Sequence, residues 1–324
     1  NVTADDFSNE SPLTIGSTTG GSRYFDGLIG EVMVFDSSMT LTDRREIISG
    51  LEEKWGIESN VVRTVETYNY TGINGEMHDI EVHFPDREIY PGNRPCAVFF
   101  HGGGWRNGDL SQFSEMSAYL ASRGMVALTA NYSMHNDESE AALPEDESRK
   151  TICVIDGKSV IKWAKDNFEM LTIDTSRMVA GGASAGGHIS VLSMMDEEHN
   201  NPADPAGIGT DLQAFLLYCP AFTLLEKDAT PEVNVFGHIK KPFPPSLYFV
   251  GEVDNWEKAS GPLADQLVDR GNKLEYWMAL EEGHMFYRES NWINLVTRKT
   301  DEFLISLGFL DGEPTIDSGN TVDT

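Results

Sequence analysis

One short stretch constrains the fold of this chain more than any other, the segment Gly-Gly-Ala-Ser-Ala-Gly-Gly-His at residues 181–188. The apolar residues 177–180 in front of it predict a strand, and residues 189–195 behind it have the periodicity of a helix. Ser184 is therefore expected on a tight turn between a strand and a helix. A turn of this kind can hold a serine hydroxyl at the end of a sheet as a nucleophile.

The small residues of this stretch suit such a turn. Gly182, Ala185 and Gly186 let the backbone bend sharply and approach its neighbours with little obstruction from side chains. The five-residue pattern around Ser184 also occurs by chance, so a glycine-rich turn with an incidental serine is the alternative interpretation. The catalytic interpretation depends on partners for the serine elsewhere in the chain.

A second glycine motif, His-Gly-Gly-Gly-Trp at residues 101–105, directly follows an apolar strand expected at 97–100. Glycines let backbone N–H groups converge on a developing oxyanion with no side chain in the way. We expect Gly103 and Gly104 to donate two such N–H groups and Ala185 a third. The alternative, a nucleotide-binding loop, is disfavoured because the spacing matches neither a dinucleotide fingerprint nor a phosphate loop with its lysine.

A serine nucleophile needs a base, and His284 is the best candidate among the eight histidines. It lies in a loop just beyond a strand expected at 274–278, close to the C-terminus, where a serine hydrolase built on an open α/β sheet carries its base. The other histidines belong to the glycine motifs or show no pattern that favours catalysis: His78, His83, His101, His135, His188, His199 and His238.

The acid that orients this histidine should follow the preceding strand, expected at 246–250. Asp254 fits best because it lies three residues past Gly251, which frees the strand end. It would accept a hydrogen bond from one imidazole nitrogen, fix the tautomer and stabilise the imidazolium. Glu252 and Glu257 are the alternatives.

From residue 76 onward, strand and helix signals alternate. The expected strands are 78–84, 97–101, 126–130, 177–180, 214–218, 246–250 and 274–278, and the expected helices are 113–120, 152–168, 189–195, 263–270 and 295–307. Such alternation predicts an α/β fold with a mostly parallel, doubly wound sheet and helices on both faces.

Residues 1–60 differ from the rest, with a Ser/Thr/Gly-rich start, one alternating strand at 28–35 and one helix at 42–56. They resemble the closing strand and helix of concanavalin-like, laminin-G-like jelly-roll domains in three stretches, residues 24–35, 41–46 and 54–57. The resemblance implies the C-terminal remnant of a carbohydrate- or surface-binding module. A structural extension packed on the next domain is the alternative.

These signals divide the chain into four parts. A small N-terminal β/α extension occupies 1–60. A linker follows at 61–75, strand-like at 61–65 and polar after that, then the main α/β domain at 76–310 and a polar tail at 311–324. Because the chain begins at Asn1, without an initiator Met or a signal-peptide pattern, we expect it to be processed or cut from a longer one.

The composition of the chain limits the classes of partner that it can bind. The chain carries 52 acidic and 24 basic residues, a formal net charge of −28, which is typical of a saline source and opposes binding to DNA, RNA or anionic lipid. We therefore expect no nucleic acid and no membrane among its partners, and no apolar run approaches the roughly 20 residues that span a bilayer. Cys96, Cys153 and Cys219 are odd in number and lack metal-ligand spacing, which predicts buried free thiols.

Taken together, the motifs are similar to those of α/β-hydrolase esterases of the acetyl esterase and hormone-sensitive-lipase-like group, and most of all to bacterial acetyl xylan and feruloyl esterases. The matching positions are 101–105, 108–109, 131–132, 182–188, Asp254 and 283–284, within a resemblance that covers residues 76–310. The resemblance implies the α/β-hydrolase fold and a carboxylic ester hydrolase that needs no metal and no cofactor.

The expected substrate is a small-molecule or polysaccharide-linked ester with a short acyl group, such as acetyl or feruloyl. Trp105 and Phe236 are the expected substrate-binding residues, at an entrance shaped by the loops 133–150 and 223–244. We expect residues 1–60 to pack near this entrance, from the same subunit or from a neighbour in a homo-oligomer, and the jelly-roll remnant favours a secreted or periplasmic location. An arylformamidase or other amide hydrolase with the same triad, and a non-catalytic binding protein, are the alternatives.

Overall fold

The computed structural model describes residues 50–51, 54, 64–143, 148–222, 234–239 and 242–316. The chain divides into two compact units, Asn1–Asn60 and Val61–Thr324. Three residues of the first unit are described, so the strand expected at 28–35 and most of the helix after it lie outside the described residues.

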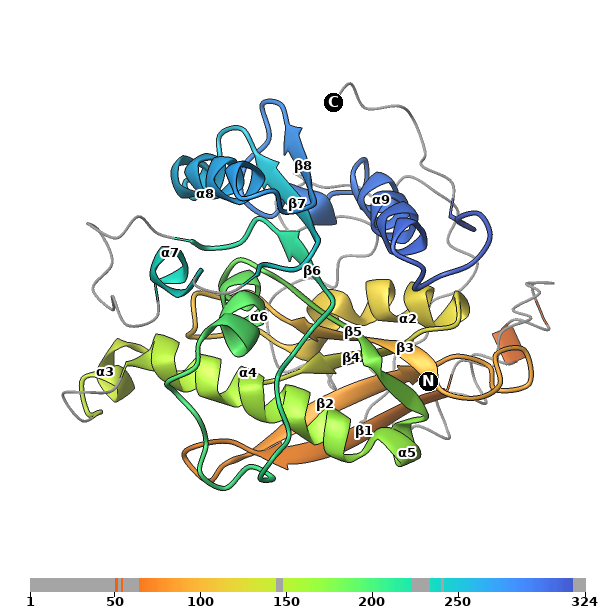
Figure 1. The fold of residues 1–324 in the computed structure, drawn as a ribbon, viewed down its shortest axis with the longest axis horizontal. Helices are drawn as coiled ribbons and strands as arrows, with labels where there is room; N and C mark the ends of the chain where they lie inside the picture. Colours follow the sequence, from red (N-terminus) through yellow and green to blue (C-terminus); the bar gives the residue numbers. More distant parts are fainter. Residues whose placement is uncertain are drawn as a thin grey trace, which may run out of the picture. The chain divides into compact units, whose positions relative to one another are not determined.

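An eight-stranded sheet organises the larger unit, with the strand order β1-β2-β4-β3-β5-β6-β7-β8 (Figure 1). Strand β2 is antiparallel to both β1 and β4, and the other neighbours are parallel. The strands are β1 (Thr64–Thr71), β2 (Met77–Phe84), β3 (Arg94–Phe100), β4 (Val126–Ala130), β5 (Ile173–Ala183), β6 (Ala214–Tyr218), β7 (Ser246–Gly251) and β8 (Leu274–Ala279). The prediction of a mostly parallel sheet is confirmed.

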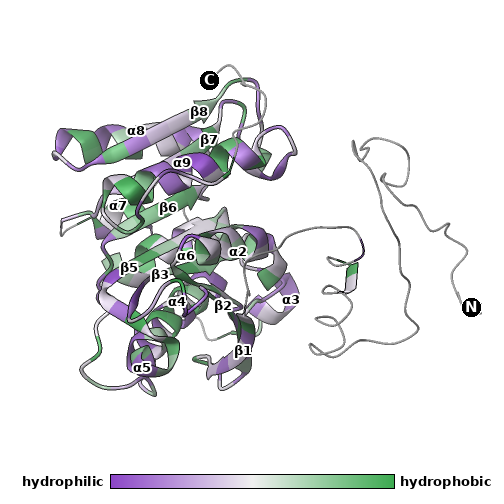
Figure 2. Ribbon diagram, turned by 90° about the vertical axis from the view of Figure 1, so that its right-hand side faces the viewer, coloured by the Kyte–Doolittle hydropathy of each residue, from purple (hydrophilic) through white to green (hydrophobic). Residues whose placement is uncertain are grey.

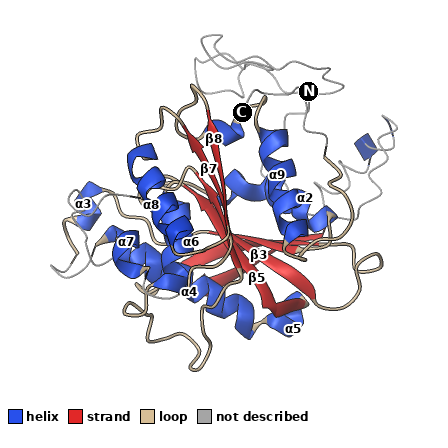
Figure 3. Ribbon diagram, turned by 45° about the horizontal axis from the view of Figure 1, so that its top comes forward, coloured by secondary structure: helices blue, strands red, loops and turns tan. Residues whose placement is uncertain are grey.

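The helices alternate with the strands, as the sequence predicts. They are η2 (Leu110–Phe113), α2 (Ser114–Ser122), α3 (Asp137–Glu140), α4 (Arg149–Asp166), α5 (Phe168–Leu171), α6 (Ala185–Met195), α7 (Val235–His238), α8 (Glu257–Asp269), η5 (Phe286–Arg288) and α9 (Ile293–Ser306). Helices α2 and α9 cover one face of the sheet, and α4, α6 and α8 cover the other (Figure 3). The expectation of helices on both faces is therefore confirmed.

Side chains that alternate along the central strands build a separate core on each face. On β3, Cys96, Val98 and Phe100 point into the core shared with α4 and α6, whereas Ala97 and Phe99 point into the core shared with α2 and α9. Because both faces are covered, the central strand β6 is buried and hydrophobic along its whole length, while the edge strand β8 has mixed polarity (Figure 2).

The sheet begins earlier than the sequence indicates. Residues 64–71, assigned above to a linker, form the edge strand β1, which pairs with β2 along its whole length. Tyr70 is buried in the core, and its hydroxyl donates to the carbonyl oxygen of Asn131 at 2.9 Å. An edge strand buries few side chains, so its residues carry only a weak apolar pattern. This part of the predicted linker is thus a strand of the sheet.

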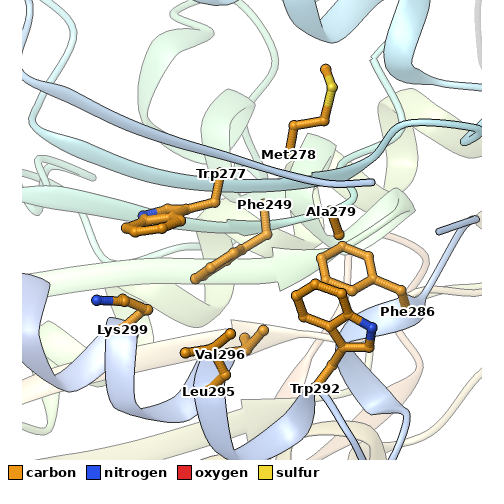
Figure 4. A pocket seen from close by; sticks show the side chains of 9 residues that line it. All are labelled: Phe249, Trp277, Met278, Ala279, Phe286, Trp292, Leu295, Val296 and Lys299. Atoms are coloured by element: carbon orange, nitrogen blue, oxygen red, sulfur yellow. The ribbon is translucent and has the colours of Figure 1, made fainter. Parts of the chain in front are cut away.

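Strand β8 forms the opposite edge, and α9 packs against it. A small apolar cavity of about 10 Å³ lies between β7, β8 and α9 (Figure 4). Residues of the two strands, η5 and α9 line it, and all but Met278, whose side chain points away from the others, turn their side chains toward it: Phe249, Trp277, Met278, Ala279, Phe286, Trp292, Leu295, Val296 and Lys299.

The first residues of the predicted polar tail contact the main α/β domain. Arg123, the residue after α2, forms a buried ion pair with Asp301 of α9 at 2.7 Å and also donates to the carbonyl oxygen of Asp311 at 2.9 Å. Arg298 donates to the carbonyl oxygen of Ile316 at 3.2 Å. Among the described residues, no helix is long and apolar enough to cross a membrane.

Candidate active site

Ser184 occupies a strained turn between β5 and α6. Its backbone has φ 52° and ψ −119°, in the left-handed range that a side chain disfavours. Its N–H donates to the carbonyl oxygens of Tyr218 and Cys219, both at 3.1 Å, and its own carbonyl oxygen accepts from Ala221 at 2.9 Å. The loop after β6 therefore holds the turn in place.

Two glycines make this turn possible. A Cβ on Gly186 would lie 1.9 Å from the carbonyl oxygen of Phe100, and a Cβ on Gly182 would lie 2.5 Å from the same atom. Helix α6 can therefore start directly behind β3 only because these two positions lack side chains. This close approach is the physical reason for the small residues in the motif.

Three side chains from three loops meet at the carboxyl edge of the sheet. His284 Nε2 lies 3.0 Å from Ser184 Oγ, and His284 Nδ1 lies 2.8 Å from Asp254 Oδ2. Asp254 also accepts from the N–H of Trp256 at 2.9 Å, which orients its carboxylate. The loops follow β5, β7 and β8, whose parallel carboxyl ends share one edge of the sheet. The structure thus brings together the three residues predicted as nucleophile, base and acid.

The alternative acids lie elsewhere. Glu252 accepts from the N–H of Glu281 at 2.9 Å, and Glu257 is the first residue of α8, with a carboxylate directed toward Gly261. Ser184 is 7% exposed, and the side chain of His284 is 31% exposed. The nucleophile is therefore sheltered, while the base keeps contact with solvent.

The loop after β3 and the turn after β5 carry the N–H groups predicted as oxyanion donors. The N–H of Gly102 donates to Gln112 Oε1 at 2.5 Å, so this N–H is already used. Within the described residues, the N–H groups of Gly103, Gly104 and Ala185 donate to no acceptor. Those three groups, predicted as the oxyanion hole, are therefore available to an acceptor such as a developing oxyanion.

The oxyanion loop has a backbone that only glycine adopts easily. Gly103 has φ 130°, and a Cβ there would lie 1.8 Å from the carbonyl oxygen of Asn107. His101 Nδ1 bonds the carbonyl oxygen of Gly102 at 2.8 Å, and burial lowers the pKa of His101. His101 is therefore neutral near neutral pH, and it supports the loop locally, as the sequence suggests.

Trp105 and Phe236 differ in how they are placed. Trp105 is 7% exposed and packs edge-on against His188, with Nε1 3.4 Å from His188 Nδ1 and Lys150 Nζ 5.1 Å from its ring centre. Phe236 is half-buried in α7 and packs against the α4–α6 core. Most of the loop 223–244 lies outside the described residues, so the substrate-binding roles of both residues stay predictions.

One cluster near the triad has the geometry for a metal ion. Ligand atoms of Cys219, Asp254 and His284 all lie within 4.8 Å of one another. Burial raises the pKa of the Cys219 thiol to about 12. Asp254 and His284 bond each other, so two of the three residues are already engaged in the hydrogen bond predicted for catalysis.

Sequence reasoning missed two residues at this site. Gln112 contacts the oxyanion loop, and Cys219 lies behind the triad with an unusual φ of 46°. Cys96, Cys153 and Cys219 are all buried and free. No local pattern distinguishes Gln112 or Cys219 from a surface or a core residue, because their neighbours at the site come from distant parts of the chain.

Known proteins with a similar sequence are hydrolases. A family model described as BD-FAE matches residues 80–219, which include the oxyanion loop and Ser184. Over 117 residues the chain is 30% identical to an AB hydrolase superfamily protein of Schizosaccharomyces pombe, covering 36% of this chain and 30% of that protein. Over 218 residues it is 23% identical to esterase LipC of Mycobacterium tuberculosis, covering 67% of this chain and 44% of that protein. The chain spans less than half the length of these curated relatives.

Solved structures give a wider match. The native structure of esterase 2 from Thermogutta terrifontis has 28% identity and a TM-score of 0.67, covering 76% of this chain and 93% of that chain. The same esterase phosphonylated by sarin has 27% identity and a TM-score of 0.69, covering 77% and 97%. The sheet, its helices and these structural neighbours together show that the chain has the α/β-hydrolase fold, in a form similar to known esterases.

Proposed function

We propose that this protein is a carboxylesterase that cleaves short-chain acyl esters through an acyl-enzyme. The observation that carries the proposal is the row from Asp254 through His284 to Ser184, with contacts of 2.8 and 3.0 Å, beside three unused backbone N–H groups. Esterase LipC and the Thermogutta esterase add support as similar proteins.

In the first half of the reaction, Ser184 Oγ attacks the ester carbonyl carbon while His284 Nε2 takes the hydroxyl proton. The carbonyl oxygen becomes an oxyanion, and the N–H groups of Gly103, Gly104 and Ala185 bind it. Asp254 accepts from His284 Nδ1 and stabilises the imidazolium. The alcohol then leaves with the proton from His284, and the acyl group stays on Ser184.

In the second half, water takes the place of the alcohol. His284 removes a proton from the water, and the resulting hydroxide attacks the acyl carbonyl. The same N–H groups bind the second oxyanion, and Ser184 leaves with the proton as the carboxylic acid is released. In both halves of the reaction, His284 Nε2 takes the proton from the attacking group and returns it to the leaving group.

For the substrate, we infer a short acyl group such as acetyl, or a feruloyl group, carried by a small molecule or by a polysaccharide. Structures of the Thermogutta esterase with bound propionate and bound butyrate support the short acyl group. The motif resemblance to acetyl xylan and feruloyl esterases supports a polysaccharide-linked ester. A secreted or periplasmic location would bring the enzyme to such a substrate.

Hydrolysis of p-nitrophenyl acetate by the wild type and by Ser184→Ala tests the activity. We expect turnover by the wild type and a loss of roughly 10⁴-fold or more in the variant, because Ser184 forms the covalent bond. Ser193→Ala is the matched control, since this serine lies in the same helix and donates to the carbonyl oxygen of Ile189. Equal rates in wild type and Ser184→Ala would refute the proposal.

A substrate panel then identifies the ester. It contains p-nitrophenyl esters of increasing acyl length, methyl ferulate, acetylated xylan and N-formylkynurenine. A preference for acetyl or feruloyl esters supports the proposed substrate. Faster cleavage of the formamide would favour the amide hydrolase instead, and inertness toward every substrate would favour a binding protein.

A further inference from the structure

Gln112 bridges two loops of the candidate active site. It lies in η2, just after the oxyanion loop, and Asp109 fixes the start of η2 by accepting from the N–H of Ser111 at 2.8 Å. Gln112 Oε1 accepts from the N–H of Gly102 at 2.5 Å, and Gln112 Nε2 donates to the hydroxyl of Tyr287 at 2.9 Å. One amide group therefore contacts both the loop after β3 and a residue that lies 175 positions further along the chain than Gln112 itself.

Chemistry fixes the orientation of this amide. The N–H of Gly102 can only donate, so the oxygen of Gln112 must face it. The amide nitrogen then faces Tyr287, whose hydroxyl oxygen must accept. Tyr287 is an immobile acceptor, because it is 5% exposed and its ring packs on Phe113 and Tyr218, with centroid distances of 6.2 and 5.2 Å.

Both ends of the bridge lie close to reacting groups. Gly102 directly precedes the donors Gly103 and Gly104, and a Cβ on Gly102 would lie 3.2 Å from the Cβ of Ser184. Tyr287 follows the base His284 by three residues. The bridge therefore sets the oxyanion donors and the base at a defined separation.

We propose that Gln112 is a positioning residue that holds the oxyanion loop and the histidine loop in register, so that the donors and the base act on the same tetrahedral intermediate. This inference rests on the proposed ester hydrolysis and adds a residue to its machinery. Gln112 acts through Gly102 and Tyr287 and does not touch the reacting atoms itself.

The test compares four variants. Gln112→Met keeps the length of the side chain and removes both hydrogen bonds. Tyr287→Phe removes only the acceptor of the second bond, and the double variant combines the two changes. Ser111→Ala is the matched control, because Ser111 is exposed on the same turn of η2.

We expect Gln112→Met to lower kcat by roughly tenfold to a hundredfold, less than the loss of a donor itself, with KM and Tm nearly unchanged. The inhibition constant of a trifluoromethyl ketone, which forms an oxyanion adduct with a catalytic serine, should rise by the factor by which kcat/KM falls. Tyr287→Phe should lose less, and the double variant should lose no more than Gln112→Met, because one bridge is broken in both. A kcat within twofold of wild type for folded Gln112→Met would overturn the proposal.

The charged variant Gln112→Glu gives a second test, the dependence of kcat/KM on pH. In Gln112→Glu the carboxylate can accept from both Gly102 and the hydroxyl of Tyr287, so both contacts are kept but a negative charge lies beside the oxyanion loop. We expect its kcat/KM to fall as the pH rises through the carboxyl pKa of about 4.3, relative to the wild-type profile. A profile parallel to the wild type in that range would contradict the proposal, even if Gln112→Met fails to fold.

The labelling rate of Ser184 by a fluorophosphonate separates this inference from the proposed function. A wild type that is labelled but cleaves no acyl substrate refutes the esterase and leaves the variants comparable by labelling rate. Ester turnover that is equal in wild type and in the bridge variants refutes the positioning role alone. A wild type that shows neither labelling nor turnover refutes both.

Discussion

At the scale of single residues, Asp254 differs from the acidic residues next to it in sequence by what its side chain contacts. Three acidic side chains follow β7 within seven residues, and one of them reaches His284. Glu252 instead caps a neighbouring loop through the N–H of Glu281. The two side chains leave a tight turn after Gly251 in different directions. A Cβ added to Gly251 would lie 2.4 Å from the carbonyl oxygen of Glu282, so this turn packs closely against the histidine loop.

Replacing the acid should remove most of the activity. In Asp254→Asn, the amide can no longer accept from His284 Nδ1 with a full charge, and it favours the wrong imidazole tautomer, so we expect kcat to fall on the order of 10⁴-fold. Steady-state kinetics on p-nitrophenyl acetate measures this loss. Glu252→Gln is the control and should stay within a few-fold of wild type; an equal loss in both variants would contradict the assignment.

The sequence predicts some residues of the candidate site and misses others. Ser184 and Gly103 are visible because a tight turn and a left-handed backbone demand particular residue types at particular spacings. Asp254 and His284 are visible because each follows a strand that the sequence predicts. Gln112 is not visible, since its importance comes from contacts with Gly102 and Tyr287, and only the closed fold places these residues around it.

At the scale of elements, the close packing of α6 behind β3 makes Gly186 sensitive to substitution. Alanine usually stabilises a helix over glycine by about 1 kcal/mol. In Gly186→Ala, however, the new Cβ would meet the carbonyl oxygen of Phe100 at 1.9 Å. We therefore expect a net destabilisation of about 1–3 kcal/mol, measured by urea unfolding, together with reduced activity as the turn at Ser184 shifts.

Gly237→Ala in α7 is the matched control for this prediction. Among the described residues, no heavy atom outside its chain neighbours and its own helix backbone lies within 4 Å of a Cβ at that position. This variant should therefore be as stable as wild type or slightly more stable. Destabilisation of both variants by the same amount would show that clash with Phe100 is not the cause.

A buried ion pair ties three further elements together. Lys158 of α4 lies 2.8 Å from Asp196, the residue after α6, and His238 of α7 lies 3.6 Å from the same carboxylate. Burial raises the pKa of Asp196, but the hydrogen bonds and charge of Lys158 and the bonds from His199 outweigh it and leave the pKa below its ordinary value. The ionised carboxylate is thus favoured by the folded state.

This lowered pKa predicts how stability changes with pH. The ionised pair should contribute fully above the unfolded-state pKa of about 3.9 and lose its contribution as the pH falls through the folded-state pKa. Asp196→Asn should therefore be less stable than wild type by about 3 kcal/mol near neutral pH, with a smaller gap at a pH of about 3. Urea unfolding at both pH values measures the gap, and a gap that widens on acidification would contradict the prediction.

The half-exposed pair Asp174–Arg177 gives the control for this prediction. Asp174→Asn is expected to change the free energy of unfolding by about 1 kcal/mol or less.

At the scale of the whole molecule, the sheet determines where the catalytic unit begins. The alternation of apolar strands and helices predicts the parallel centre of the sheet, because those strands are buried on both faces. It does not predict β1 beyond residue 65, because an edge strand with one exposed side mixes Tyr68 and Tyr70 with polar neighbours. Pairing with β2, rather than hydrophobicity, makes these residues a strand.

Two truncations test this boundary. A chain that starts at residue 61 keeps β1 and serves as the reference. A chain that starts at residue 76 loses β1, removes the N–H of Ile73 from buried Asp156, which accepts it at 2.8 Å, and bares the edge of β2. We expect its Tm to fall by roughly 5 °C or more. Equal melting of the two truncated chains would show that β1 adds nothing.

Among the three strands that precede the triad residues, β5, β7 and β8, only β8 lies at an edge of the sheet, and it precedes the base. Strand β8 ends the sheet beside β7, five of its six residues are half-exposed, and His284 follows it by five residues. Fraying of this edge would draw the imidazole away from a serine that the deeply buried β5 still holds. On mild warming, activity would then be lost reversibly before the core amides begin to exchange with deuterium. A rate assay would therefore detect the local opening of one edge strand at temperatures where the rest of the sheet is still folded.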